Sequence, residues 1–217
     1  MSQILDIQMR GKRFVDLTSS SFRTKLVSIA NRLGLDPSAL ATVMMFETST
    51  TMSPSVRNPY SNATGLIQFM PATARNMGTT VDALAQMSAV DQLNWVEKYF
   101  SPWAGRLRSV QDHYLAVFMP SLIGTALSYV VARTGDIVYT QNSGFDGSKK
   151  GYFTTGDIVY PITSAYSAAA TRPTVYVPGL DWMTPVRFAG IVFIFGTMGA
   201  AMGYGVSWSL KTIGVTA

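Results

Sequence analysis

The chain of 217 residues is 47% hydrophobic and only 13% charged, and its formal net charge is +5. This length allows one domain of about 150 residues with its own core, together with additional segments. The absence of cysteine excludes disulfides and thiolate chemistry, and a single histidine leaves any zinc site almost entirely to carboxylates. We therefore expect no metal and no cofactor.

The first part of the chain carries much of the positive charge. Its basic residues are Arg10, Lys12, Arg13, Arg23, Lys25 and Arg32. Two interpretations stay open: a solvated surface, or attraction to an anionic partner such as a cell-wall polymer or lipid headgroups. No recognition motif indicates nucleic acid. Residues 1–19 are predicted to form an N-terminal arm, with a short alternating segment and no secretory signal, because charges interrupt its apolar stretches.

Two helices are predicted to follow the arm. The first spans Ser20–Leu33 and ends at Gly34, since glycine adopts the left-handed conformation that often ends a helix. The second begins with Asp36 as its N-cap and Pro37 as its first helical residue. Both assignments rest on capping chemistry as well as on hydrophobic spacing.

Glu47, one of two glutamates in the chain, lies on the apolar face of this second helix. It falls at position i+7 of a series with helical spacing, whose members are Leu40, Val43 and Met44. A carboxylate on an inward face loses hydration, which disfavours its charged form and raises its pKa. Such a group suits a general acid near neutral pH, although an inward glutamate also occurs as one half of a structural ion pair.

A polar segment and several further helices are predicted next. Residues 48–62 are rich in Ser, Thr, Pro and Asn, as loops are, and they lead through residues 65–68 into a short helix at 71–78. Ser88 and Ser109 each open a capping-box pattern, which is a helix-start signal. The predicted helices that follow span residues 88–100, 109–119 and 122–133.

The last third of the chain changes in composition. The pentapeptide Gly135–Tyr139 recurs as Gly156–Tyr160, which indicates two similar helix starts or short strands. Residues 161–185, rich in Pro, Thr, Ser and Ala, are predicted to be a linker. Residues 186–211 are predicted to form a transmembrane helix, followed by a tail at 212–217.

The transmembrane prediction rests on the uncharged run from residue 188 to residue 210. As a helix this run would be about 35 Å long, enough to cross a hydrocarbon layer of about 30 Å. Membrane lipid is therefore an expected partner through residues 188–210. The alternative is a buried core helix or a glycine-rich packing segment, since five glycines weaken an isolated helix in water.

Several motifs together resemble a known family. They are Leu33–Pro37, Glu47–Thr48, Ala63–Ala74, Asp91–Trp103 and Tyr114–Pro120. Over residues 20–160 the chain resembles the lytic transglycosylase domain related to goose-type lysozyme, in its phage-encoded form. The resemblance implies a mainly α, lysozyme-like helical domain, here with a C-terminal transmembrane helix.

The resemblance also implies roles for individual residues. Glu47 would be the catalytic acid and base, and Gly65 and Gln68 would shape the floor of a sugar-binding cleft. Tyr139 and Asn142 match the family's third motif and would line the site near the scissile bond. Thr48 occupies the position where the family usually has serine, and its hydroxyl would bind substrate.

A calcium-binding loop occurs in related phage sequences, and residues 146–157 show traces of it. Asp146 and Asp157 stand at the first and last positions of such a loop, but Lys150 occupies a position where a ligand oxygen is needed. We therefore expect poor calcium affinity.

The reaction implied by the resemblance is cleavage of the β-1,4 bond between N-acetylmuramic acid and N-acetylglucosamine in peptidoglycan glycan strands. Glu47 would protonate the leaving oxygen and then accept the proton of the muramyl C6 hydroxyl, which closes a 1,6-anhydro ring. A second carboxylate is not obligatory, and no acidic residue occurs between Glu47 and Asp82.

The expected setting is a membrane-anchored phage virion protein that acts on the host cell wall during genome entry, with other virion membrane or capsid proteins as further partners. The alternatives are a hydrolysing lysozyme, a non-catalytic structural or wall-binding virion membrane protein, and a holin-like membrane protein. The last is disfavoured because only one membrane span is predicted.

Overall fold

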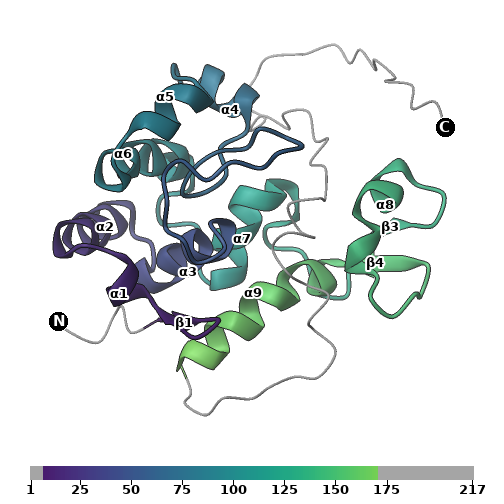
Figure 1. Cartoon of the computed structure of the whole chain (residues 1–217). Coiled ribbons are helices and arrows are strands. Elements are labelled where there is room, and N and C mark those ends of the chain that lie inside the picture. Colours follow the sequence, from purple (N-terminus) through teal and green to yellow (C-terminus); the bar gives the residue numbers. More distant parts are fainter. Residues whose placement is uncertain (1–6, 171–217) are drawn as a thin grey trace.

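The computed structural model describes residues 7–170, and this part of the chain is mainly helical (Figure 1). Its helices are α1 (Phe14–Leu17), α2 (Ser20–Leu33), α3 (Pro37–Glu47), α4 (Pro71–Asn76), α5 (Val81–Gln86), α6 (Ala89–Phe100), α7 (Val110–Phe118), α8 (Ile137–Asn142) and α9 (Thr155–Ala170). Short 3₁₀ helices occupy Ser101–Trp103, Pro120–Leu122 and Ser143–Phe145.

Two small antiparallel strand pairs complete the described elements. Strand β1 (Gln8–Met9) pairs with β2 (Lys12–Arg13), and β3 (Val130–Arg133) pairs with β4 (Tyr152–Thr154). In the second pair Ala132 lies opposite Phe153. Together with α8, this pair forms a lobe beside the helices (Figure 1).

The caps predicted from the sequence define several helix ends. Gly34 ends α2 with a φ of 62°, and its N–H donates to the carbonyl groups of Ala30 and Asn31. Asp36 Oδ1 accepts a hydrogen bond from Ser38 N at 2.8 Å and opens α3. Ser88 and Ser109 cap α6 and α7 as predicted, and a complete capping box is present at Ser109.

Helix α3 lies at the centre of the described structure. Every residue from Ala39 to Met45 is buried, so this helix is enclosed on all sides, and its one buried polar side chain, Thr42, donates to Ser38 O at 2.7 Å. One side, including Leu40 and Met44, packs in a core shared with α2 and α6. The other side, including Val43, packs in a second core shared with α7 and α9. Helix α3 therefore carries its last residue, Glu47, into the middle of the described structure.

Three expectations about the elements were wrong. The predicted N-terminal arm is folded from Ile7 onward, because Ile7, Met9 and Phe14 are buried in the first core. The predicted helix at 122–133 is absent: its end, Val130–Arg133, is strand β3, in keeping with the preference of β-branched valines for strands.

The third concerns the linker predicted at 161–185, whose first ten residues belong to α9. Ile158, Val159 and Ile162 are buried in the second core, and this packing outweighs the linker-like composition and the internal Pro161. Within residues 7–170 no helix combines the length and the apolar character needed to cross a bilayer. The predicted transmembrane segment at 186–211 and the tail at 212–217 lie outside the described residues.

Candidate active site

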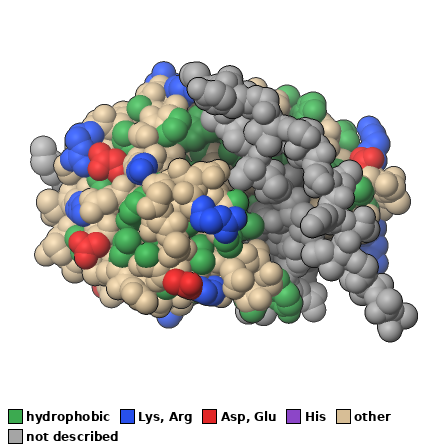
Figure 2. All heavy atoms as spheres, turned by 90° about the horizontal axis from the view of Figure 1, so that it is seen from above, with side chains coloured by type: hydrophobic (Ala, Val, Ile, Leu, Met, Phe, Trp, Pro, Cys, Tyr) green, Lys and Arg blue, Asp and Glu red, His purple; other side chains and the backbone are tan. Residues whose placement is uncertain are grey.

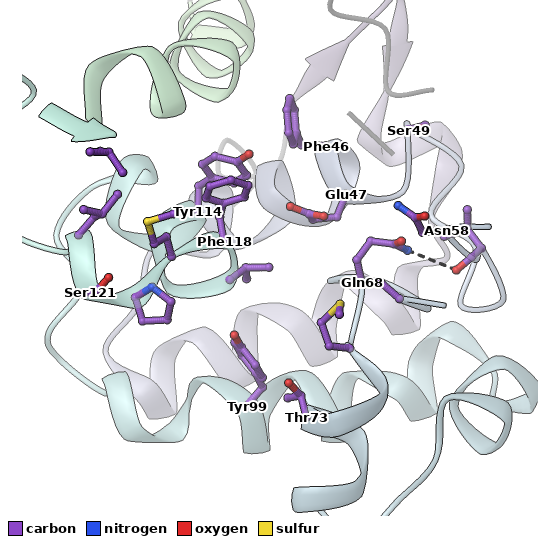
Figure 3. A pocket seen from close by; sticks show the side chains of 18 of the residues that line it. Phe46, Glu47, Ser49, Asn58, Gln68, Thr73, Tyr99, Tyr114, Phe118 and Ser121 are labelled. Atoms are coloured by element: carbon purple, nitrogen blue, oxygen red, sulfur yellow. Dashed lines mark hydrogen bonds between the residues drawn. The ribbon is translucent and has the colours of Figure 1, made fainter. Parts of the chain in front are cut away.

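A cavity of about 380 Å³ opens where the C-terminal end of α3 meets α7, α6 and the loop before α4 (Figure 3). Its polar lining includes Glu47, Asn58, Gln68, Tyr99 and Tyr114. One end is formed by the end of α7, the following 3₁₀ helix, β3 and α8. Its lining is mainly apolar but also includes two hydroxyl groups: Val117, Phe118, Met119, Pro120, Ser121, Leu122, Tyr129, Val131 and Val138. In Figure 3, Asn58 and Gln68 lie on one side of Glu47, and Tyr114 and Phe118 lie on the other.

Glu47 is a buried acid with one face open to this cavity. It is the last residue of α3, and its side chain is partly exposed while the helix behind it is enclosed. Burial raises the pKa of Glu47 to about 8. The negative end of the helix dipole also disfavours its charged form. No hydrogen bond or ion pair from residues 7–170 compensates for this loss of hydration, so Glu47 is mostly protonated at neutral pH.

Thr48 fixes the turn that follows the acid. Its side chain is fully buried; its hydroxyl donates to Met44 O at 2.7 Å and accepts from Met52 N at 3.1 Å. Ser49, Thr50 and Met52 all have positive φ angles, which is strained for residues other than glycine. Thr48 therefore holds a strained turn next to Glu47, and the predicted direct bond to substrate is incompatible with its burial.

Gln68 reaches the cavity from a loop that also has a left-handed backbone. Its φ is 51°, and its Nε2 donates to Gly65 O at 3.1 Å and to Val56 O at 3.3 Å. The side-chain amide is thus oriented by the loop itself, and its oxygen is not used in these two bonds. Gln68 and Glu47 line the same cavity.

Gly65 does not line the cavity; it lies in the loop before α4, which the side chain of Gln92 from α6 holds in place by hydrogen bonds. The Gln92 side chain accepts from Leu66 N at 2.7 Å and donates to Leu84 O and Pro54 O at 2.8 and 3.0 Å. A Cβ atom on Gly65 would lie 2.4 Å from Gln92 Oε1, and the φ of Gly65 is +86°. Gly65 is therefore required for packing and backbone conformation rather than for contact with a ligand.

Two tyrosines enclose Glu47 that the motif-based prediction missed. Burial is the main cause of the raised pKa of both Tyr99 and Tyr114, and the charge of Glu47 adds to it, which places both hydroxyls in the electrostatic field of the acid. Tyr99 donates to Ala116 O at 2.9 Å. Tyr114 stacks on Phe118 with ring centroids 5.6 Å apart, and its hydroxyl bonds to none of the described residues. The Tyr114–Pro120 stretch, one of the motifs in the resemblance, contributes to this side of the cavity.

Tyr139 and Asn142 do not line the cavity. The Tyr139 hydroxyl donates to Asp146 Oδ2 at 2.8 Å, and Asn142 is buried, with its Nδ2 donating to Val138 O at 3.0 Å. Val138 is the residue of α8 that lines the cavity. The predicted third-motif roles therefore do not match the structure.

The two carboxylates of the loop at 146–157 bind groups of the loop itself. Asp146 is buried and accepts from Lys150 N and Gly151 N at 2.8 and 2.7 Å. Asp157 pairs with Lys150 Nζ at 2.9 Å. This loop does not turn its carboxylates toward a shared centre, and no group of three or more potential metal ligands occurs among the described side chains.

His113 is a buried histidine away from the cavity lining. Its Nδ1 lies 2.7 Å from Ser109 O, and its Nε2 has no hydrogen-bond partner within residues 7–170. Burial lowers its pKa, so that the ring is neutral at physiological pH. We assign it a packing role beside Phe100.

Comparisons with protein families, with curated proteins and with solved structures find no match to this chain.

Proposed function

We propose that this protein is a peptidoglycan lytic transglycosylase with a lysozyme-like catalytic domain and that Glu47 is its catalytic acid and base. The observation that carries the proposal is the acid itself. Glu47 is the only acidic residue in the described lining of the cavity, and its pKa is raised to about 8. A site with one protonated carboxyl matches a reaction in which the same group first gives and then takes a proton.

The mechanism follows from this arrangement. Protonated Glu47 donates its proton to the glycosidic oxygen, and the bond from muramyl C1 to that oxygen breaks. The resulting carboxylate accepts the proton of the C6 hydroxyl, and O6 forms a bond to C1, which regenerates the acid. The internal hydroxyl replaces water as the nucleophile, so no second carboxylate is needed, in contrast to inverting glycosidases.

Another cavity residue supports this chemistry. The side-chain oxygen of Gln68 can accept a hydrogen bond from a sugar hydroxyl or acetamido N–H group.

The test is turnover of purified peptidoglycan by the full-length protein and by Glu47→Gln. We expect at least a 1,000-fold loss of activity in this variant, since it cannot donate or accept the proton (a loss of about 4 kcal/mol). Glu97→Gln is the matched control, because Glu97 is the other glutamate and pairs with Arg32 on the surface at 2.9 Å. Equal activity of wild type and Glu47→Gln would contradict the assignment.

Product analysis distinguishes the two enzyme classes. A transglycosylase releases 1,6-anhydromuropeptides, which are lighter by one water than the products of a hydrolysing lysozyme, and mass spectrometry separates them. We further propose, from the sequence, that residues 188–210 anchor the protein in a membrane of a phage virion. Carbonate extraction tests the anchor: release of the full-length protein from membranes would refute it.

A further inference from the structure

Ser49 places a hydroxyl group in the lining of the cavity, two residues after Glu47. Its side chain is half-buried, and in Figure 3 it lies on the same side of Glu47 as Asn58. The Ser49 hydroxyl bonds to none of the described residues. Other hydroxyls of the segment are used within it, in bonds of 2.7, 2.8 and 3.0 Å: Thr48 to Met44 O, Thr51 to Thr48 O, and Ser53 with Ser55.

The backbone holds Ser49 in a strained conformation. Its φ is 53°, in the left-handed region that residues other than glycine and asparagine rarely adopt. The main-chain groups of the turn are bonded, since Ser49 N donates to Phe46 O at 3.1 Å and Thr50 N donates to Met45 O at 2.7 Å. Glycine at this position would remove the strain, but it would also remove the hydroxyl from the cavity. Strained residues of this kind cluster at sites whose function depends on their geometry.

A second strained residue contributes to the same side of the cavity. Gln68 has a φ of 51°, and its Nε2 is bonded to two carbonyl groups of its own loop, so its side-chain oxygen remains as an acceptor. This side of the cavity therefore combines an acceptor from Gln68 with a donor from Ser49, and the backbone holds both in place. Five of the seven described non-glycine residues with positive φ lie between Glu47 and Pro71: Ser49, Thr50, Met52, Asn62 and Gln68.

Both of these side chains are uncharged. On the face of the molecule shown in Figure 2, acidic and basic side chains are scattered over the described surface and form no continuous patch. In a binding site, a few polar groups in fixed positions determine the orientation of the ligand. A neutral donor and a neutral acceptor beside a protonated acid fit a ligand rich in hydroxyl and acetamido groups, as glycan strands are.

We propose that Ser49 is a substrate-binding residue whose hydroxyl donates a hydrogen bond to an oxygen of the glycan strand next to Glu47. Ser49 then has the contact that the sequence motif assigned to Thr48, and Thr48 instead holds the turn that presents it. This inference rests on the proposed function.

The experiment measures binding, so that it does not depend on turnover. Full-length Glu47→Gln protein in detergent is cosedimented with purified peptidoglycan, alone and with the added changes Ser49→Ala, Ser49→Gly and Asn62→Gly. Asn62→Gly is the matched control, because Asn62 is an exposed, uncharged residue with positive φ in the same segment and does not line the cavity. It shows what an added glycine does to binding through chain flexibility alone. Urea unfolding of each protein is measured in parallel.

We expect Ser49→Ala and Ser49→Gly each to weaken binding about three- to tenfold, as for the loss of one neutral hydrogen bond. Asn62→Gly should bind like the parent protein. Ser49→Gly should unfold at the same urea concentration as the parent or at a higher one, because glycine relieves the strain.

Unchanged binding in both Ser49 variants, or an equal loss in Asn62→Gly, would overturn the inference. So would a loss of binding that occurs only together with a lower urea midpoint, since Ser49 would then hold the loop rather than contact the glycan. Failure of the proposed function shows separately, as wild-type protein that cleaves no peptidoglycan.

Discussion

The raised pKa of Glu47 makes a quantitative prediction about stability. In the folded protein the carboxyl keeps its proton up to a pKa of about 8, whereas in the unfolded chain it ionises near 4.5. Between these two values only the folded state holds the proton, so unfolding releases it and rising pH favours the unfolded state. The sign is therefore a loss of stability as the pH rises from 4.5 to 8, with no further effect outside this range.

The magnitude follows from the same two values. Each pH unit in this window lowers the free energy of unfolding by about 1.4 kcal/mol, which amounts to about 5 kcal/mol in full. Water in the cavity solvates the open face of Glu47, so about 2–5 kcal/mol is the expected range. This is a large share of the stability of about 5–15 kcal/mol typical of a domain.

Glu47→Gln isolates the effect, since glutamine is isosteric and does not titrate. Urea unfolding of the full-length protein and the variant in detergent at pH 5, 7 and 9 gives the free-energy difference between them at each pH. We expect the variant to gain stability relative to wild type as the pH rises, and to be the more stable protein at pH 9. Parallel pH profiles would refute the reasoning that Glu47 is a buried, uncompensated acid.

Three further predictions follow from the same geometry. The first step needs protonated Glu47, so kcat should fall about tenfold for each pH unit above pH 8. Release of anhydromuropeptides measures kcat. A kcat that stays constant up to pH 10 would contradict the acid role of Glu47. Gly65→Ala should lower the free energy of unfolding by about 2–4 kcal/mol, because the added Cβ collides with Gln92. Gly78→Ala is the control: its φ is similar but the space around it is open, so it should lower the free energy of unfolding by only about 1–2 kcal/mol. Equal losses of the two variants in urea unfolding would argue against the close contact between Gly65 and Gln92. Thr48→Val should cost about 1–3 kcal/mol and reduce turnover by displacing Glu47, and Thr48→Ser should restore both; a serine variant as impaired as the valine variant would show that the hydroxyl is not what matters.

Local signals in the sequence predicted much of the helical framework. Asp36, Gly34 and the two capping serines define helix ends through bonds within three or four residues, so their effect does not depend on the rest of the fold. Helical spacing alone does not single out Glu47, because every residue from Ala39 to Met45 of α3 is buried; the neighbouring motif with Gly65 and Gln68 is what pointed to it.

The residues around Glu47 were harder to predict because they meet only in three dimensions. Tyr99 and Tyr114 come from two different helices; both lie in stretches that the resemblance included, but the motifs gave neither tyrosine a role in the site. Tyr139 and Asn142 matched a motif in sequence, but the Asp146 loop binds Tyr139 and helix α8 binds Asn142. A motif gives residue types and spacing, whereas the partners that take up each polar group depend on tertiary packing.

Helix α9 determines where the chain can be divided. It spans the boundary at residue 160 that composition indicated, and it packs against α3, α7 and β1. A protein ending at 160 would lose Ile162 from the second core and leave the buried faces of α3 and α7 exposed to solvent. A fragment for crystallisation or enzyme assays that leaves out the apolar residues 188–210 should therefore end after Ala170. Such a fragment keeps the packing of α9 against α3, the helix that carries Glu47.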